Sequence, residues 1–371
     1  MKEFILPVRE DLVGSVPYGA PQLDVPVRLN VNENPFPLPA HIASTMGAAV
    51  AAIAPDLHRY PDREAIELRE ALARYLAQEA GVELALEQVW AANGSNEVMH
   101  QLFLAFGGPG RTAVSFDPTY SMYPEYARDT FTRYLTFTRE PDFSINVPAA
   151  IRQLKDLHPS LVLLTSPNNP TGTMLPTDDL VQLLDAALLI NSVVIVDEAY
   201  AEFRTAGTPS ALELLASYPN LVVTRTMSKA FGLAGARLGY AASSAAIVDA
   251  LRIVRLPYHL SAVTQVVAIT ALQFAEVLQA QVATLRSERD DLAAWLMAEG
   301  FRVAPSEANF ILFGTFADRD LVWQALLDQG VLIRQTGPDG WLRVSIGTSD
   351  ENDRFRQALA QAPGTEQEAA R

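Results

Sequence analysis

Residues 161–200 read LVLLTSPNNPTGTMLPTDDLVQLLDAALLINSVVIVDEAY, which has the pattern of a strand, a helix and a second strand. The apolar runs at 161–165 and 193–196 have the length of buried strands, and 177–189 has leucines at helical spacing. Apolar strands that alternate with helices predict a parallel sheet with helices on both faces. We therefore expect an α/β, doubly wound domain.

The same alternation continues on both sides of this stretch. Runs of β-forming residues at 112–116 and 221–224 predict two more strands, and the apolar residues of 62–80 and 96–106 have helical spacing. Gly81 stands where the first of these helices would end.

The C-terminal third has a different pattern. A long charged helix pattern is followed by the shorter runs EANFILF, GVLIRQ and GWLRVSIGT, which predict a smaller α+β unit. We expect a large domain at 30–260, and a small domain built from the N-terminal arm, 1–29, together with 261–371.

Polar, turn-forming residues follow four of the predicted strands. The run DPTY follows Phe116, SPNNPTG follows Thr165, DEAY follows Val196, and RTMSKAFGLAGAR follows Thr224. Open α/β sheets bind ligands at the carboxyl ends of their strands. The four runs therefore predict one shared site.

Composition excludes several classes of function. The chain of 371 residues has 28 Lys and Arg against 43 Asp and Glu, a net charge of −15, and no Cys. Because no basic stretch supplies phosphate contacts, we expect no nucleic-acid partner. Without Cys there is no thiolate nucleophile, and the five His lack metal-ligand spacing, so we expect no metal.

Two segments bear on localisation. The start, MKEFILPVRE, has too short an apolar run for a signal peptide. The uncharged stretch 256–275 is about as long as a membrane span, but it contains Pro257, His259 and Gln265, so we expect a buried helix there. We expect a cytoplasmic protein with no membrane partner.

The basic residues divide into 25 Arg and only three Lys, which are Lys2, Lys155 and Lys229. A lysine that forms a Schiff base has to lie in a desolvated pocket where its amine can be neutral. Lys2 is terminal, and Lys155 lies in a polar stretch typical of an exposed helix. Lys229 follows a predicted buried strand and precedes small residues that would let a ligand approach, so it is the candidate nucleophile.

Asp197 ends the apolar run VVIVD, where an anion is unfavourable unless it meets a positive partner. The nitrogen of a pyridinium ring would be such a partner. At a separation of about 4 Å and an effective dielectric of about 20, the attraction is roughly 4 kcal/mol. The alternative is that Asp197 caps the helix that follows.

Two further turns carry weaker signals. Asn169 lies in a turn rich in Pro and Gly, where Asn is common for backbone reasons alone. In ANGSNE, Gly94 would allow close approach, and Ser95 and Asn96 would present N–H groups to an anion at a helix start. No Walker or GxGxxG motif is present, which disfavours a nucleotide site.

The order of these motifs resembles a known family. An Asn in NNPTG, an Asp in DEAY, and a Ser-Lys pair with an Arg eight residues later resemble the fold-type I pyridoxal-phosphate aminotransferases. The likeness runs from LNVNENPF at 29–36 to LRVSIGT at 342–348. Within that superfamily, VPYGAP, YPD, PTYSMY and DEAYAEF are most similar to the histidinol-phosphate aminotransferases.

The resemblance implies roles for the matching residues. Lys229 would bind pyridoxal 5'-phosphate covalently and move the proton between the substrate α-carbon and C4′ of the cofactor. Asp197 would pair with the ring nitrogen, making the ring an electron sink. The other implied cofactor contacts are Asn169 and Tyr200 at the phenolic oxygen, Tyr120 stacked on the ring, and Gly94, Ser95, Asn96, Ser228, Arg237 and Tyr60 at the phosphate. Tyr60 would come from the second subunit of a homodimer.

The resemblance also implies a substrate site. Arg343 would hold the α-carboxylate of glutamate, because a guanidinium fork suits a planar carboxylate. Arg334 would meet the distal anion, either the second carboxylate of glutamate or the phosphate of histidinol phosphate, with Tyr18 and Asn34 nearby. Asn309 in EANF would orient the anion or a loop.

The implied reaction is ping-pong transamination between histidinol phosphate and 2-oxoglutarate, giving imidazole-acetol phosphate and glutamate, in histidine biosynthesis. The sequence departs from the family pattern in PYGAPQ at 17–22, where a Pro-Gly pair is more usual after the Tyr, and at Met227. The substrate therefore stays open: an aromatic amino acid aminotransferase and a threonine-phosphate decarboxylase-like enzyme share this scaffold. A cofactor-binding regulatory module is disfavoured, because only about 30 residues precede LNVNENPF and no basic patch is evident.

Overall fold

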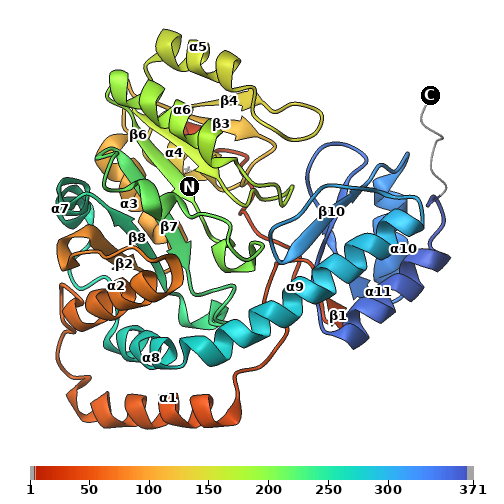
Figure 1. The fold of residues 1–371 in the computed structure, drawn as a ribbon, viewed down its shortest axis with the longest axis horizontal. Helices are drawn as coiled ribbons and strands as arrows, with labels where there is room; N and C mark the ends of the chain where they lie inside the picture. The colour runs from red at the N-terminus through yellow and green to blue at the C-terminus, as the bar shows by residue number, and fades with distance from the viewer. Residues whose placement is uncertain (1–3, 5, 366–371) are drawn as a thin grey trace.

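The computed structural model describes residue 4 and residues 6–365, and its largest element is a seven-stranded sheet (Figure 1). In spatial order the strands are β2 (Val89–Ala92), β8 (Gly239–Ser243), β7 (Leu221–Thr226), β6 (Val193–Asp197), β5 (Leu161–Thr165), β3 (Thr112–Asp117) and β4 (Arg133–Thr138). The five strands from β7 to β4 run parallel to one another, while β8 runs antiparallel to both of its neighbours. The expected class, α/β with a mainly parallel sheet between helices, is confirmed.

Helices cover both faces of this sheet because its strands are apolar on both sides. In β5, Leu161 and Leu163 pack toward one face, and Val162 and Leu164 pack toward the other. The first face is covered by α3 (Ser95–Phe106), α4 (Tyr123–Asp129) and α7 (Ala245–Val254). The second is covered by α2 (Ile66–Ala80), α5 (Val147–Leu157) and α6 (Thr177–Leu189).

The predicted elements lie close to the observed ones. The helix predicted at 177–189 matches α6 at both ends, and α2 ends before Gly81, whose φ of 69° is the left-handed conformation of a helix stop. The helix predicted at 62–80 begins only at Ile66. The Asp62 carboxylate accepts a hydrogen bond from the Ile66 N–H at 2.8 Å, so Asp62 lies in the turn before the helix.

A second sheet forms the smaller domain, to the right of the large one in Figure 1. Its antiparallel strands, in spatial order, are β12 (Arg334–Gln335), β13 (Leu342–Ser345), β10 (Phe310–Gly314) and β9 (Arg302–Val303). The helices α10 (Arg319–Asp328) and α11 (Ser349–Gln361) belong to the same domain. Here β1 (Val27–Arg28) pairs in parallel with β11 (Val331–Leu332), so the N-terminal segment joins the C-terminal third.

The long helix α9 (Ala275–Ala298) runs from the large domain to the small one (Figure 1). The helix before it, α8 (Ala262–Gln273), packs against α1 (Ala40–Ile53) and α2, so it accompanies the large domain in space. The domain boundary at residue 260 stays a prediction. In the described part of the chain no single helix is long and apolar enough to span a bilayer; α8 and α9 meet those criteria only as a pair bent by 75°.

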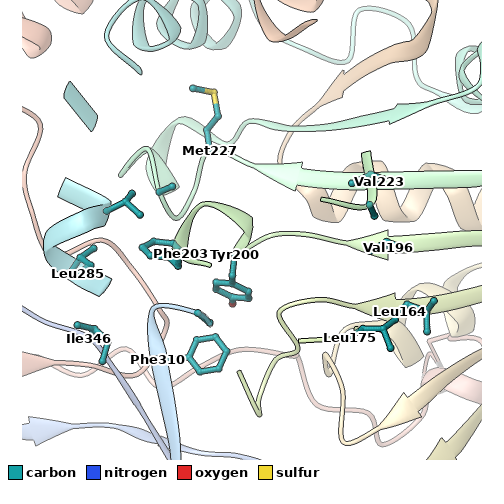
Figure 2. Close-up of a cluster of buried hydrophobic side chains, with 14 of the residues drawn as sticks. Leu164, Leu175, Val196, Tyr200, Phe203, Val223, Met227, Leu285, Phe310 and Ile346 are labelled. Carbon is teal, nitrogen blue, oxygen red and sulfur yellow. The ribbon is translucent and has the colours of Figure 1, made fainter. Parts of the chain in front are cut away.

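The cores of the two domains meet below the turn after β6. Tyr200 in this turn points toward Phe310 on β10 (Figure 2), with ring centroids 5.0 Å apart and ring planes at 82°. Both rings are buried, as is Phe203 beside Tyr200. The turn is therefore held against the small sheet by packing. The remaining elements are short 3-10 helices at Glu10–Leu12, Ala54–Asp56, Leu86–Gln88, Ala201–Phe203, Ala211–Leu214 and Ala234–Ala236.

Candidate active site

A cavity of about 1120 Å³, including its open mouth, lies at the carboxyl ends of β3, β5, β6 and β7. All four polar runs that follow these strands contribute to its wall, as predicted. The N-terminal segment and the small sheet supply the rest. The wall includes Tyr18, Asn30, Asn32, Ser95, Asn96, Tyr120, Asn169, Asp197, Tyr200, Ser228, Lys229, Arg237, Arg334 and Arg343.

Lys229 lies just beyond β7, and its Nζ donates a hydrogen bond to the Val31 carbonyl at 2.9 Å. Burial lowers the pKa of this amine to about 8, with the positive charges of Arg343 and Arg237 acting in the same direction and Glu33 against it. A lysine amine that loses its proton near neutral pH can attack an aldehyde.

Asp197 is the last residue of β6, and both of its carboxylate oxygens accept hydrogen bonds. Oδ1 accepts from the Ala199 N–H at 3.2 Å and the Thr224 hydroxyl at 3.3 Å, while Oδ2 accepts from the Tyr123 hydroxyl at 3.1 Å. Burial raises the pKa of Asp197 to about 6, and the hydrogen bonds oppose that rise. Within the described residues no cationic side chain pairs with it, so the cavity holds a carboxylate that suits a cationic ligand.

The next carboxylate, Glu198, has a different environment. It is buried, pairs with Arg225 at 2.7 Å and accepts a hydrogen bond from the Ser210 hydroxyl at 2.8 Å. It is not part of the cavity wall. The two acids of DEAY are therefore not a catalytic pair: Asp197 faces the cavity, and Glu198 anchors the turn.

The Tyr200 hydroxyl lies between two amide groups. It accepts hydrogen bonds from Asn32 Nδ2 at 3.0 Å and from Asn169 Nδ2 at 3.3 Å. Asn32 is held in turn by Ser345, whose hydroxyl donates to Asn32 Oδ1 at 2.9 Å. Because a hydroxyl has two lone pairs and one proton, these contacts leave the Tyr200 proton free to donate to a ligand.

An anion cradle lies at the start of α3. The first N–H groups of a helix have no partners within it, and here they begin at Ser95. Gly94 has a φ of 81°, and a Cβ there would lie 2.6 Å from a terminal nitrogen of Arg237. A Cβ at Gly239 would clash with the Ser95 backbone. The two glycines therefore let Arg237 and β8 approach the helix start, beside the Ser228 hydroxyl.

Two arginines face the cavity from the small sheet. Arg334 on β12 and Arg343 on β13 are direct cross-strand partners. Burial lowers the pKa of Arg343 to about 10, and the charge of Arg334 adds to this effect. Like charges opposite each other on a sheet are unfavourable, so the pair suits an anionic ligand.

Arg343 also contacts the large domain. It donates to Asn169 Oδ1 at 2.5 Å and to the Asn30 carbonyl at 3.0 Å, while its buried Nε has no partner among the described residues. The guanidinium therefore keeps one N–H group without a partner at the cavity wall.

Two tyrosines line the cavity. The Tyr120 hydroxyl donates to Asn96 Oδ1 at 3.4 Å. The Tyr18 hydroxyl lies 2.7 Å from the Ser121 hydroxyl, which ties the N-terminal segment to the turn after β3.

Four predicted site residues lie outside the cavity wall. Gly94 is directly behind Arg237, and Asn309 lies behind Asn32, to whose carbonyl its Nδ2 donates at 3.0 Å. Asn34 accepts the N–H of the residue two positions later in a local turn. Tyr60 is 79% exposed and is not part of the cavity wall of its own chain. The roles given to these residues stay predictions.

The polar residues at the strand ends do not by themselves identify Asn30, Asn32, Tyr123 and Thr224 as part of the site. Asn30 and Asn32 lie in the quoted LNVNENPF, and Tyr123 ends PTYSMY, so both segments were visible as part of the resemblance. Their contacts were not, because each pairs with a residue far along the chain. For Thr224, the sequence predicts only the end of a strand.

Comparison with known proteins places the chain in a family. The family model for class I and II aminotransferases matches residues 25–359. The chain is 57% identical over 359 residues to the histidinol-phosphate aminotransferase of Thermobifida fusca, covering 97% of this chain and 96% of that protein. It is 54% identical over 371 residues to the one of Bifidobacterium adolescentis, covering 96% and 95%.

Solved structures share the fold. The histidinol-phosphate aminotransferase from Sinorhizobium meliloti in complex with pyridoxal-5'-phosphate has a TM-score of 0.84 at 24% identity, covering 96% of this chain and 97% of that one. A tetra mutant of Thermus thermophilus aspartate aminotransferase has a TM-score of 0.81 at 25% identity, covering 97% and 98%.

Proposed function

The chain belongs to the class I and II aminotransferases, and on this premise we propose that it transfers an amino group between histidinol phosphate and 2-oxoglutarate, giving imidazole-acetol phosphate and glutamate. Relatives that are 52–57% identical over nearly the whole chain are named histidinol-phosphate aminotransferases. The reaction belongs to histidine biosynthesis, and we propose a cytoplasmic location.

One observation carries the substrate proposal. The adjacent arginines Arg334 and Arg343 face the same cavity as Lys229 and Asp197. A substrate whose anionic group is held by the arginines would have its amine within the space that Lys229 lines. Phosphate and carboxylate both suit guanidinium groups, which accounts for two substrates that bind in turn.

Pyridoxal phosphate is the cofactor, and the groups of the cavity fit it. Asp197 offers an unpaired carboxylate for the ring nitrogen, and Lys229 offers an amine with a lowered pKa for the aldehyde. The start of α3, with Arg237 and Ser228, offers N–H and hydroxyl donors for the phosphate.

When bound, the cofactor supplies a protonated ring that withdraws the electron pair left by the departing α-proton. Asp197 would keep the ring nitrogen protonated, and Tyr120 would pack against the ring. Tyr200 and Asn169 would donate to the phenolic oxygen, since the Tyr200 hydroxyl accepts from two amide groups and keeps its own proton to donate.

Lys229 moves the proton. With the cofactor bound, its neutral amine would take the proton from the substrate α-carbon and hand it to C4′ of the cofactor. A pKa lowered to about 8 favours this role, because an amine that is protonated and deprotonated near working pH can act in both directions. The Val31 carbonyl accepts a hydrogen bond from Nζ at 2.9 Å, which holds the amine at the cavity wall.

Arg343 and Arg334 hold the anionic groups of both substrates. Arg343 binds the α-carboxylate of glutamate, and Arg334 binds the distal carboxylate or the phosphate of histidinol phosphate. Tyr18, which lines the same cavity and contacts Ser121, would lie near the bound substrate. We propose that Asn34, which lies outside the cavity wall, contributes to substrate binding through the local turn that its side chain stabilises.

A substrate panel tests the proposal. Purified protein loaded with cofactor is given histidinol phosphate, phenylalanine or O-phosphothreonine with 2-oxoglutarate, and glutamate and carbon dioxide are measured. We expect the largest kcat/KM for histidinol phosphate, with glutamate formed and no carbon dioxide. Turnover of phenylalanine at least as fast contradicts the substrate, and carbon dioxide release from O-phosphothreonine without an oxo acid contradicts transamination.

A homodimer would complete the site. Tyr60 is stacked on Tyr258 at a centroid distance of 4.4 Å and is exposed, as are Leu57, Ile253 and Leu256 in the same two segments. Exposed apolar groups gathered in this way favour burial against a second copy. We propose that Tyr60 of each subunit reaches the cofactor phosphate of the other.

Hybrid dimers test the assignment of Tyr60. Lys229→Ala and Tyr60→Ala chains are co-expressed, so that hybrids have one site with both residues intact. With random pairing, half of the dimers are hybrids, and each hybrid has one intact site of two. We therefore expect about a quarter of the wild-type activity, whereas each variant expressed alone has little activity. Lys229→Ala with Asp197→Ala is the matched control, because both changes lie on the same chain's site and no hybrid restores it. Failure of the first mixture to recover activity contradicts action across the interface.

A further inference from the structure

The carboxylate of Asp197 is held by a tyrosine that lies outside the cavity wall. Tyr123, the first residue of α4, has no exposed surface, and its hydroxyl donates to Asp197 Oδ2 at 3.1 Å. In the described part of the chain, no other group donates to that oxygen. The two residues are 74 positions apart, so the contact exists only in the folded chain.

The ring of Tyr123 has a second contact. It meets the ring of Tyr120 edge to face, with centroids 5.6 Å apart and planes at 87°. Tyr120 lines the cavity, and Tyr123 stands behind it. One buried side chain thus contacts both the predicted ring-nitrogen partner and the predicted stacking ring.

The charged and titratable groups around this pair are few. Asp197 is faced by Glu198 on its own segment and by three tyrosines from the surrounding elements, Tyr120, Tyr126 and Tyr200. The groups that face Tyr123 from β4 and the loop beyond it are Tyr134 and Arg139. Since Arg139 donates to the Phe116 and Phe143 carbonyls, no cation of the described chain pairs with Asp197.

We propose that Tyr123 is a positioning residue that keeps Asp197 ionised and aimed into the cavity, and so strengthens its hold on the nitrogen of the cofactor ring. The proposal rests on the proposed function only for the identity of the cofactor. It assigns no new group to the reacting atoms, because Tyr123 acts through Asp197.

The direction of the effect follows from the chemistry of the hydrogen bond. A hydroxyl that donates to a carboxylate stabilises the ionised form, and burial destabilises it. Burial raises the pKa of Asp197, and the Tyr123 hydrogen bond opposes this rise. Loss of the hydroxyl therefore raises the pKa, so the acid limb of cofactor binding moves to higher pH.

The test compares two tyrosines of the same short helix. Tyr123→Phe removes the hydroxyl bound to Asp197 and keeps the ring against Tyr120. Tyr126→Phe is the matched control: Tyr126 is 4% exposed, and its hydroxyl has no partner among the described residues. Both holoproteins are titrated with acid while the visible absorption of the bound cofactor is followed, and the pH profile of kcat/KM and the cofactor dissociation constant are measured.

For Tyr123→Phe we expect cofactor binding about 10-fold weaker or more, and an acid limb about one pH unit higher, since hydrogen bonds to charged groups have this strength. For Tyr126→Phe we expect the wild-type profile. The proposal is wrong when both variants shift alike or when neither shifts. If Tyr123→Phe does not fold, Thr224→Val is used to test the proposal, because it removes the 3.3 Å hydrogen bond to Asp197 Oδ1. A smaller shift in the same direction supports the proposal that hydrogen-bond donors keep Asp197 ionised. An unchanged profile overturns it.

The two failures can be told apart. A wild-type protein that binds the cofactor but does not use histidinol phosphate contradicts the proposed function and leaves the acid titration of Tyr123→Phe intact. A wild-type protein that uses histidinol phosphate, with Tyr123→Phe unchanged in both readouts, contradicts the role of Tyr123 alone.

Discussion

Replacing Lys229 with alanine lowers kcat by about 10⁴-fold or more, because proton transfer and covalent attachment are lost together. The same variant leaves no cofactor attached to the protein after reduction with borohydride. Lys229 lines the cavity and carries the lowered pKa, so no other residue of the described chain can replace it. The assay measures transamination and the absorbance of the reduced, denatured protein.

Lys155→Ala is the control for this prediction. Lys155 is exposed on α5, away from the cavity, and Lys2 lies outside the described residues. We expect wild-type activity and a wild-type adduct for Lys155→Ala. A reduced adduct that persists in Lys229→Ala would place the attachment elsewhere.

The pKa of Lys229 adds a pH signature to the same experiment. Attack on the aldehyde needs the neutral amine, whose fraction rises as the pH passes about 8. Cofactor added to the protein freed of it should therefore attach faster as the pH rises through this value and then level off. Attachment at a constant rate through this range contradicts the depressed pKa.

Replacing Asp197 with asparagine has the second largest effect, lowering kcat/KM by about 10³-fold. At about 4 Å and an effective dielectric of about 20, loss of the charge pair removes roughly 4 kcal/mol, and each 1.36 kcal/mol is about tenfold. Asparagine keeps the shape of the side chain and removes its charge. Steady-state kinetics at several pH values measure the loss.

Asp117→Asn is the matched control for Asp197→Asn. Asp117 also ends a strand of the same sheet, β3, but it is exposed and is not part of the cavity wall. We expect it to leave kcat/KM unchanged. An Asp197→Asn variant as active as Asp117→Asn shows that no charge is needed at that position, and the assignment of Asp197 fails.

The large sheet and its ligand edge could be predicted from the sequence because the information is local. The run 161–165 is apolar, ends in polar residues, and forms β5 with the predicted bounds. In the same way Lys229 and Asp197 each follow a buried strand directly. Where strand ends meet at one edge, local signals add up to one site.

The rest depends on contacts between distant parts of the chain. Gly239–Ser243 has no β-branched residue, so its sequence does not predict a strand; it becomes β8 by pairing with β2 and β7. Arg343 reaches Asn169 across 174 positions, and Ser345 reaches Asn32 across 313. No pattern within one segment encodes such pairs.

The start of helix α2 shows how a side chain sets a helix boundary. The sequence predicts a helix from residue 62, but the Asp62 carboxylate accepts the Ile66 N–H from the turn before it, and the helix begins four residues later, at Ile66. Spacing alone predicts which face of a helix is buried, and capping groups decide where the helix begins.

We propose that this cavity transfers an amino group from histidinol phosphate to the bound cofactor and then to 2-oxoglutarate. The most direct measurement is the visible absorption of the cofactor-loaded protein mixed with histidinol phosphate alone, followed by 2-oxoglutarate. We predict that the aldehyde form of the bound cofactor converts to the amine form in the first step, and that the second step restores it with one glutamate released per site. An absorption spectrum that histidinol phosphate leaves unchanged, while glutamate alone converts it, would contradict the proposed substrate.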